Sequence, residues 1–116
     1  MYTIAFFTRR VPGMSREQFF DHYRGTHYDL AVRMPGLVSY QQSELAHGDE
    51  RWPPSAPFEP FDALSLYTFE SREAAVAAFT SAEGLEVDAD TPGFMEWSSI
   101  LSAPAEVIRR FDADTG

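Results

Sequence analysis

The sequence predicts an α+β fold in which a four-stranded antiparallel sheet carries two helices on one face. The 116 residues suffice for one core but not for two, and 44% of them are hydrophobic. Segments rich in aromatic and β-branched residues alternate with two capped segments of helical spacing, in the ferredoxin-like order βαββαβ. We expect one domain over residues 1–111, with a proline-rich loop at 47–60 and a flexible tail at 112–116.

The first strand and the first helix have clear boundary signals. Tyr2–Arg9 is rich in aromatic and β-branched residues, and Val11-Pro12-Gly13 follows it. Ser15 then supplies an N-cap, and Gln18 three residues later completes a capping box. The helix that begins there is expected to end at Pro35-Gly36.

This helix carries a histidine on its apolar face. Phe19, Tyr23, His27, Leu30 and Met34 are four, four, three and four residues apart, which places them on one side of a helix. A neutral histidine can take up and return a proton near pH 7. The structural alternative is a core histidine that bonds to the backbone or to a tyrosine.

The middle of the helix contains signals of interruption. Gly25 weakens a helix interior, and Thr26 with Asp29 forms a second capping box, so we expect a kink or restart just before His27. His22 lies five residues before His27, which puts the two side chains about 140° apart on an ideal helix. We therefore expect His22 to be solvated and no metal site to include both histidines.

The rest of the chain is expected to complete the fold with strands at Leu37–Leu45 and Asp62–Phe69, a second helix from Ser71, and a last strand. The segment between the second helix and the last strand reads as a short helical turn or loop, and Asp88 and Asp90 read as structural residues that cap the turn around Thr91-Pro92. The expected bounds of these last parts are Glu83–Thr91 for the turn, Trp97–Ala103 for the fourth strand, and Glu106–Phe111 for its extension.

Composition excludes several classes of function. The formal net charge is −9 and every basic residue other than histidine is an arginine, which argues against nucleic acid and anionic membranes as partners. The absence of cysteine excludes disulfides and thiolate chemistry. No apolar stretch reaches membrane-spanning length, and the first apolar run reads as a strand rather than a signal peptide. We expect a cytoplasmic protein whose bare sheet face is covered by a second copy in a homodimer.

Several runs of the sequence, in a fixed order and spacing, match a known family. They are Met14-Ser15-Arg16-Glu17-Gln18-Phe19, Tyr23 and Arg24 followed by His27, Met34-Pro35-Gly36-Leu37 with Tyr40, Phe61-Asp62-Ala63, Phe69, and Asp90 to Phe94. Through these residues the chain resembles the EthD family of dimeric α+β barrel proteins. The resemblance covers most of the chain outside the proline-rich loop and the tail. It implies a homodimer whose two sheets form a barrel, with a pocket in each subunit between sheet and helices.

Within this family, the Met-Pro-Gly-Leu-x-x-Tyr run is most similar to methylmuconolactone methylisomerases. There a helix histidine and a strand tyrosine line the active site, and the matching positions here are His27 and Tyr40. Those enzymes also have a cysteine in the third strand, where this chain has Tyr67. The resemblance thus implies an acid–base pocket but leaves the specific reaction open.

We therefore expect His27, Tyr40 and Tyr67 to be catalytic and to act without a metal or other cofactor on a small lactone, aromatic or polyketide-like molecule. Isomerisation, cyclisation and dehydration all suit such a set. Two alternatives are a cofactor-free monooxygenase of an aromatic polyketide, which the absence of asparagine weakens, and a non-catalytic ligand-binding or accessory dimer. The expected substrate-binding residues are Tyr23, Trp52 and Phe20.

Overall fold

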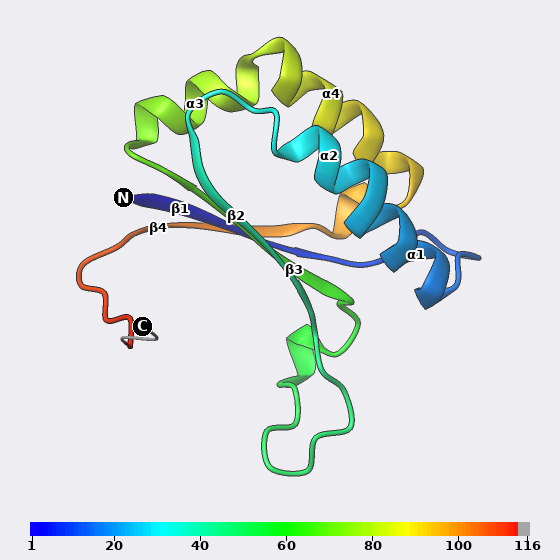
Figure 1. The fold of residues 1–116 in the computed structure, drawn as a ribbon. Helices are drawn as coiled ribbons and strands as arrows, with labels where there is room; N and C mark the ends of the chain where they lie inside the picture. Colours follow the sequence, from blue (N-terminus) through cyan, green and yellow to red (C-terminus); the bar gives the residue numbers. More distant parts are fainter. Residues whose placement is uncertain (114–116) are drawn as a thin grey trace.

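The structure is a computed structural model that describes residues 1–113. Its four strands form one antiparallel sheet in the order β2-β3-β1-β4, and the helices lie together over one face of it (Figure 1). This confirms the expected fold class. The main elements are β1 (Tyr2–Thr8), α1 (Arg16–His22), α2 (Tyr28–Ala31), β2 (Leu37–Glu44), β3 (Ala63–Phe69), α3 (Arg72–Thr80), α4 (Ala82–Asp90) and β4 (Leu101–Glu106).

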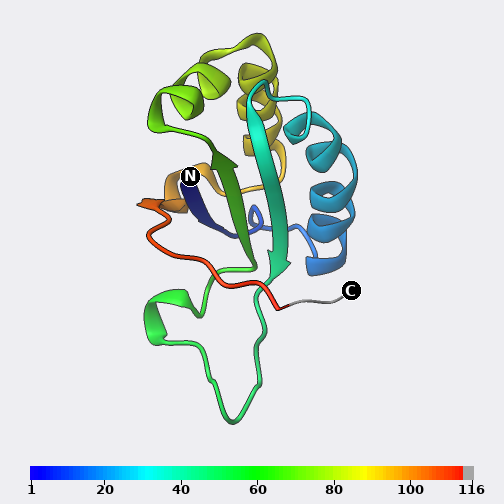
Figure 2. The same ribbon diagram turned by 60° about the vertical axis from the view of Figure 1, so that its left-hand side comes forward.

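Side-chain alternation along β3 separates the two faces of the sheet. Ala63, Ser65, Tyr67 and Phe69 are buried beneath the helices, whereas the residues between them are half-buried on the open face. The core between sheet and helices forms two clusters, one around Tyr67 and Phe69 and the other around Phe19, at the first helix. The loop between β2 and β3 projects beyond this layered body (Figure 2) and contains a short 3₁₀ turn at Ala56–Phe58.

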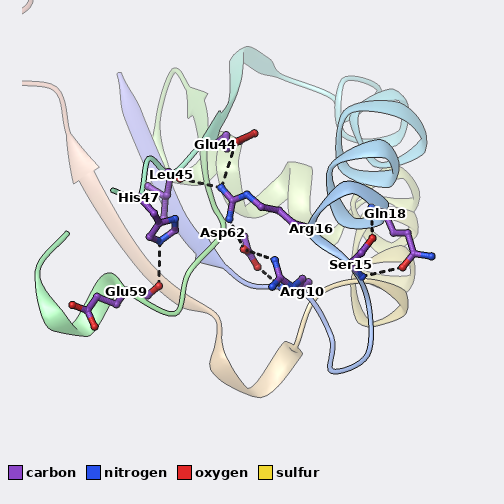
Figure 3. A network of polar contacts seen from close by, with 9 residues as sticks. All are labelled: Arg10, Ser15, Arg16, Gln18, Glu44, Leu45, His47, Glu59 and Asp62. Atoms are coloured by element: carbon purple, nitrogen blue, oxygen red, sulfur yellow. Dashed lines mark hydrogen bonds and ion pairs between the residues drawn. The ribbon is translucent and has the colours of Figure 1, made fainter. Parts of the chain in front are cut away.

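The first helix begins as the sequence predicts. The Gln18 amide N–H donates to Ser15 Oγ at 3.0 Å, and the Ser15 N–H donates to Gln18 Oε1 at 2.9 Å (Figure 3). This reciprocal pair satisfies two of the backbone donors that a helix N-terminus leaves open. The capping box is confirmed.

The expected kink or restart before His27 corresponds to a π-helical turn that interrupts the α-helix, and no new helix start forms there. The helix continues through a π-helical turn at Tyr23–His27, in which the Tyr28 N–H bonds to the Tyr23 carbonyl five residues earlier. The second capping box of Thr26 and Asp29 does not form, because Thr26 lies inside this turn and α2 starts without a side-chain cap. Gly25 lies inside the wider turn, where its weak helix preference is tolerated.

The segment expected as a short helical turn or loop at Glu83–Thr91 is a longer and regular α-helix, the nine-residue α4. Ser81 ends α3 and also begins α4, since its Oγ accepts from the Gly84 N–H at 3.1 Å. Two helices thus meet at one residue, so no loop separates them in the sequence. Close packing at this corner requires Gly84, because a Cβ there would lie 2.3 Å from the Ala78 carbonyl oxygen.

The last strand is shorter than expected and starts later. β4 pairs only with β1, from Leu101 opposite Phe7 to Glu106 opposite Tyr2, and β1 has no residues left to pair beyond that point. A 3₁₀ turn at Trp97–Ser99 takes up the start of the expected strand, and the expected extension to Phe111 lacks a partner strand. The other strand bounds differ by one residue, and residues 114–116 of the expected tail lie outside the described residues.

The Gly84 contact makes a sharp prediction about stability. Gly84→Ala adds a methyl group against a carbonyl oxygen and is expected to lower the free energy of unfolding by about 1–3 kcal/mol, although alanine is the better helix former by about 1 kcal/mol. Gly25→Ala is the matched control, because a Cβ at Gly25 meets nothing within 4 Å, and it should be neutral or stabilising. Urea unfolding measures both, and equal effects would contradict the packing argument.

Candidate functional site

A cavity of about 250 Å³ lies between the sheet and the helices. Its walls are mostly aromatic and aliphatic, with a few polar side chains among them, as is typical of sites for small organic molecules. The cavity is lined by Phe6 and Thr8 of β1, His27, Ser65 and Tyr67 of β3, Phe79 of α3, Val87 and Asp88 of α4, and Thr91, Met95, Trp97 and Ile100.

His27 is the titratable ring in the wall of this cavity. It is only 2% exposed, and its Nδ1 lies 2.9 Å from Asp90 Oδ2. An ionised carboxylate only accepts hydrogen bonds, which assigns the Nδ1–H tautomer to the neutral ring. The second nitrogen, Nε2, therefore carries the lone pair that can accept a proton.

A second histidine shares the same carboxylate. His22 Nε2 lies 2.9 Å from both oxygens of Asp90, so this residue holds two imidazole rings at once. The expectation that His22 points away from His27 is wrong, because it assumed ideal helix geometry, and with 35% of its side chain exposed His22 is only partly solvated. In the π-helical turn, residues five apart lie one above the other on the same side of the helix.

Burial lowers the pKa of His27 from its ordinary value of 6.5, while the hydrogen bond and negative charge of Asp90 oppose that shift and nearby His22 adds to it. The ring is thus neutral at pH 7. In the unfolded chain, protonation occurs near pH 6.5, whereas the folded chain binds that proton only at lower pH. This site consequently makes the protein less stable as pH falls below 6.5.

The three tyrosines that were expected at the site differ in their positions relative to the cavity. Tyr67 lines the cavity, and Tyr40 packs on it with ring centroids 4.6 Å apart. Tyr40 lies behind that wall, where Gln42 Nε2 donates to its hydroxyl at 2.8 Å. The Tyr23 hydroxyl contacts Ser65 Oγ, so Tyr23 supports the cavity from the core. Burial raises the pKa of all three hydroxyls, which keeps them protonated as donors.

Two of the expected ligand-binding residues lie away from the cavity. Trp52 is 72% exposed in the loop between β2 and β3, and the tryptophan in the cavity wall is Trp97. Phe20 lies in α1, and the centroid of its ring is 5.1 Å from Cζ of the Arg16 guanidinium. Neither is among the residues that line the cavity.

The sequence did not single out most of the residues that build the site, among them Asp90, Ser65 and Thr8. Asp90 was expected only to cap a turn, although it belongs to the Asp90–Phe94 segment that supports the family resemblance. Ser65 lies two residues before Tyr67 on the same face of β3, a signal that strand alternation offers. Thr8 had no distinguishing signal. It lies at the end of β1, where the following residues of the chain pair with the 91–100 segment.

A second hollow, at the N-terminal end of α1, is polar and internally paired. Buried Asp62 accepts from the Arg10 N–H at 2.9 Å and from Arg16 Nη1 at 2.9 Å, and Arg16 also contacts Glu44 (Figure 3). His47 bonds to the Glu59 carbonyl oxygen at 3.1 Å in the same region. These pairs use the arginine charges to join β1, α1, β2 and β3, which indicates a structural role.

Residues 1–113 were compared with the side-chain arrangement of a metal centre and with the length of a membrane-spanning helix. No three histidine or carboxylate side chains there are arranged to hold a metal ion. Among the same residues, no helix has the length and apolarity needed to cross a membrane.

The βαββαβ order and the antiparallel sheet define a ferredoxin-like α+β protein. Its cavity lies between the helices and the sheet face that they cover. The EthD domain family matches residues 11–98, which is more than half of the chain, and the chain belongs to that family. The expected family membership is confirmed. A comparison with curated proteins finds no match.

Solved structures show the same fold at low sequence identity. An EthD family protein from Bacillus halodurans has a TM-score of 0.73 at 18% identity, covering 93% of this chain and 100% of that one. The hydroxynitrile lyase of Passiflora edulis has a TM-score of 0.72 at 16% identity, covering 96% of each chain. A dimeric ferredoxin-like protein from a Jannaschia species scores 0.66 at 15% identity, covering 91% and 98%.

The shared carboxylate predicts opposite effects of two substitutions on the pKa of His27. Asp90→Asn removes the charge that favours the imidazolium, so the NMR titration midpoint of His27 should fall below its wild-type value. His22→Gln keeps a donor beside Asp90 but removes a ring that opposes protonation, so the midpoint should rise. Long-range nitrogen–proton spectra should also report the Nδ1–H tautomer in the wild type. Shifts of the same sign in both variants would contradict the arrangement.

Proposed function

We propose that this protein is a cofactor-independent acid/base enzyme that isomerises, cyclises or dehydrates a small ring compound in the cavity. The observation that carries the proposal is the His27–Asp90 pair, in which a buried neutral imidazole lines the cavity and its Nδ1–H is held by a carboxylate. Pairing with a carboxylate fixes the tautomer of a general base and stabilises the imidazolium that forms.

The neighbouring groups suit the charge that such a reaction develops. When His27 Nε2 removes a proton next to a carbonyl group, negative charge moves to the carbonyl oxygen. Tyr67 lines the same cavity and stays protonated, so it can donate to that oxygen. Tyr40 acts in this proposal by packing on Tyr67, with Gln42 fixing its hydroxyl. Tyr23 orients Ser65 from behind the wall.

The fold is compatible with this chemistry, since one of its neighbours is named a hydroxynitrile lyase. A non-catalytic binding protein would use the same cavity but would not need His27 as a base. The two functions therefore differ in the consequence of replacing one histidine, which the experiment below measures.

We also propose that the protein is a homodimer that pairs through the open face of the sheet. Ala5, Leu66 and Ala103 lie side by side on that face, opposite the helices. Ile108 and Phe111 follow β4 and are 98% and 88% exposed, in a segment that leaves the sheet on its open side (Figure 1). A second copy would cover these apolar side chains, and several structural neighbours are described as dimeric.

The acid/base proposal predicts catalysed proton exchange in a simple ketone. In heavy water, the protein should accelerate deuterium incorporation at the activated carbon of 2-tetralone, a neutral bicyclic ketone, above the buffer rate. His27→Gln should reduce that acceleration by about 100-fold or more, and Tyr67→Phe by about 100-fold, because one removes the base and the other removes the donor. Proton NMR follows the exchange.

His47→Gln is the matched control for the exchange assay, because His47 lies at the other, paired hollow and its replacement should leave the rate unchanged. Circular dichroism and unfolding show whether each variant is folded. Exchange that persists in folded His27→Gln, or no acceleration by the wild type, would contradict the proposed base and favour a binding protein.

The dimer proposal predicts that charge on the open face disrupts assembly. Leu66→Arg places a cation at the centre of that face and should convert a dimer into a monomer in size-exclusion chromatography with light scattering. Leu85→Arg, on the exposed side of α4, is the control and should remain dimeric. A monomeric wild type would contradict the proposal directly.

A further inference from the structure

The Thr8 hydroxyl is a buried polar group whose hydrogen bonding the described residues do not satisfy. Thr8 is 2% exposed and lines the cavity, yet among the described residues its Oγ1 has no hydrogen-bond partner. Its backbone is satisfied, because the Thr8 carbonyl accepts from the Asp62 N–H at 2.9 Å. A buried hydroxyl without a partner is unfavourable, and native structures rarely leave one unless something else binds it.

The other short hydroxyl side chains of the cavity wall are already engaged. Thr91 Oγ1 donates to the Val87 carbonyl at 2.8 Å, and Ser65 Oγ contacts the Tyr23 hydroxyl. Among these short side chains, Thr8 is therefore the one whose hydroxyl remains available to a molecule in the cavity, in addition to the Tyr67 hydroxyl that the proposed function uses. The unpartnered hydroxyl and the cavity are independent observations, and both indicate that a ligand binds next to Thr8.

The charge of the cavity restricts what that ligand can be. No arginine is among the lining residues, the sequence has no lysine, and His27 is neutral at pH 7. The one carboxylate, Asp88, is at the exposed rim. A ligand carboxylate would thus lose its hydration with no cation to replace it, and it would face the negative charge of Asp88 on entry.

We propose that the cavity selects neutral one- or two-ring compounds that carry an uncharged oxygen, and that Thr8 is the specificity-determining residue that hydrogen bonds to this oxygen. The inference rests on the proposed function only in taking this cavity as the substrate site. It narrows the expected ligands to hydroxyl- or carbonyl-bearing rings and excludes carboxylated lactones.

The test compares three probes of one size at pH 7: 1-naphthol, naphthalene and 1-naphthoate. NMR titration of the full chain should show 1-naphthol binding about tenfold more tightly than naphthalene, because it gains a hydrogen bond to Thr8. The anionic 1-naphthoate should bind at least tenfold more weakly than 1-naphthol. Shift changes should include residues around Thr8 and His27.

Two variants of Thr8 separate its hydroxyl from its shape. Thr8→Val replaces the hydroxyl by a methyl group and should abolish the preference for 1-naphthol over naphthalene, without loss of stability, because the replaced group has no partner in the protein. Thr8→Ser keeps the hydroxyl and should keep the preference. Thr91→Val is the control, since it removes a cavity hydroxyl that is already bonded to Val87.

The inference is overturned if Thr8→Val binds the three probes in the same ratios as the wild type, if 1-naphthoate binds as well as 1-naphthol, or if no probe binds. These outcomes are distinguishable from failure of the catalytic proposal. Binding selectivity without catalysed deuterium exchange would remove the enzyme function and keep the Thr8 assignment, whereas exchange without selectivity would do the reverse.

Discussion

The sharing of the Asp90 carboxylate between two histidines determines how the helical layer is built. Asp90 is the last residue of α4, whereas His22 directly precedes the π-helical turn of the first helical segment and His27 is the last residue of that turn. The contact therefore joins two elements that are distant in the sequence. It also places a carboxylate, which only accepts hydrogen bonds, beside the His27 ring, whose pKa burial lowers. The neutral ring can then serve as a base through Nε2.

This contact depends on two local features of backbone geometry. An uninterrupted α-helix would direct His22 and His27 to different sides, so the π turn is required for both to reach one carboxylate. The abrupt joint between α3 and α4, with Ser81 as shared cap and Gly84 allowing close approach, brings α4 over the sheet. Both features position His27, the π turn because it contains this residue and the joint because it places α4, which carries Asp90.

The sequence was sufficient for the parts of the structure that depend on periodicity and capping. The bounds of the first three strands, the Ser15 capping box and the burial of His27 on the inner side of the first helical segment follow from local pattern. The π turn was misread because Gly25 and Thr26 resemble a stop, and only the pairing of His22 and His27 with Asp90 gives the wider turn a tertiary reason to persist. α4 was missed because its cap is also the end of α3. The orphan hydroxyl of Thr8 emerges only once the cavity is formed.

One desolvated environment connects the proposed base to the proposed ligand. Burial lowers the pKa of His27 because the interior disfavours the imidazolium, and the same interior disfavours a charged ligand. Asp90 offsets the cost of a buried imidazolium from outside the cavity, by accepting the hydrogen bond of His27 Nδ1, so that His27 can hold a substrate proton during a reaction. Within residues 1–113, no positively charged residue lines the cavity to offset the cost of burying an anionic ligand. A chain with Tyr67 rather than a thiol, and without a cation in the wall, therefore suits proton transfer within a neutral molecule more than recognition of an acid.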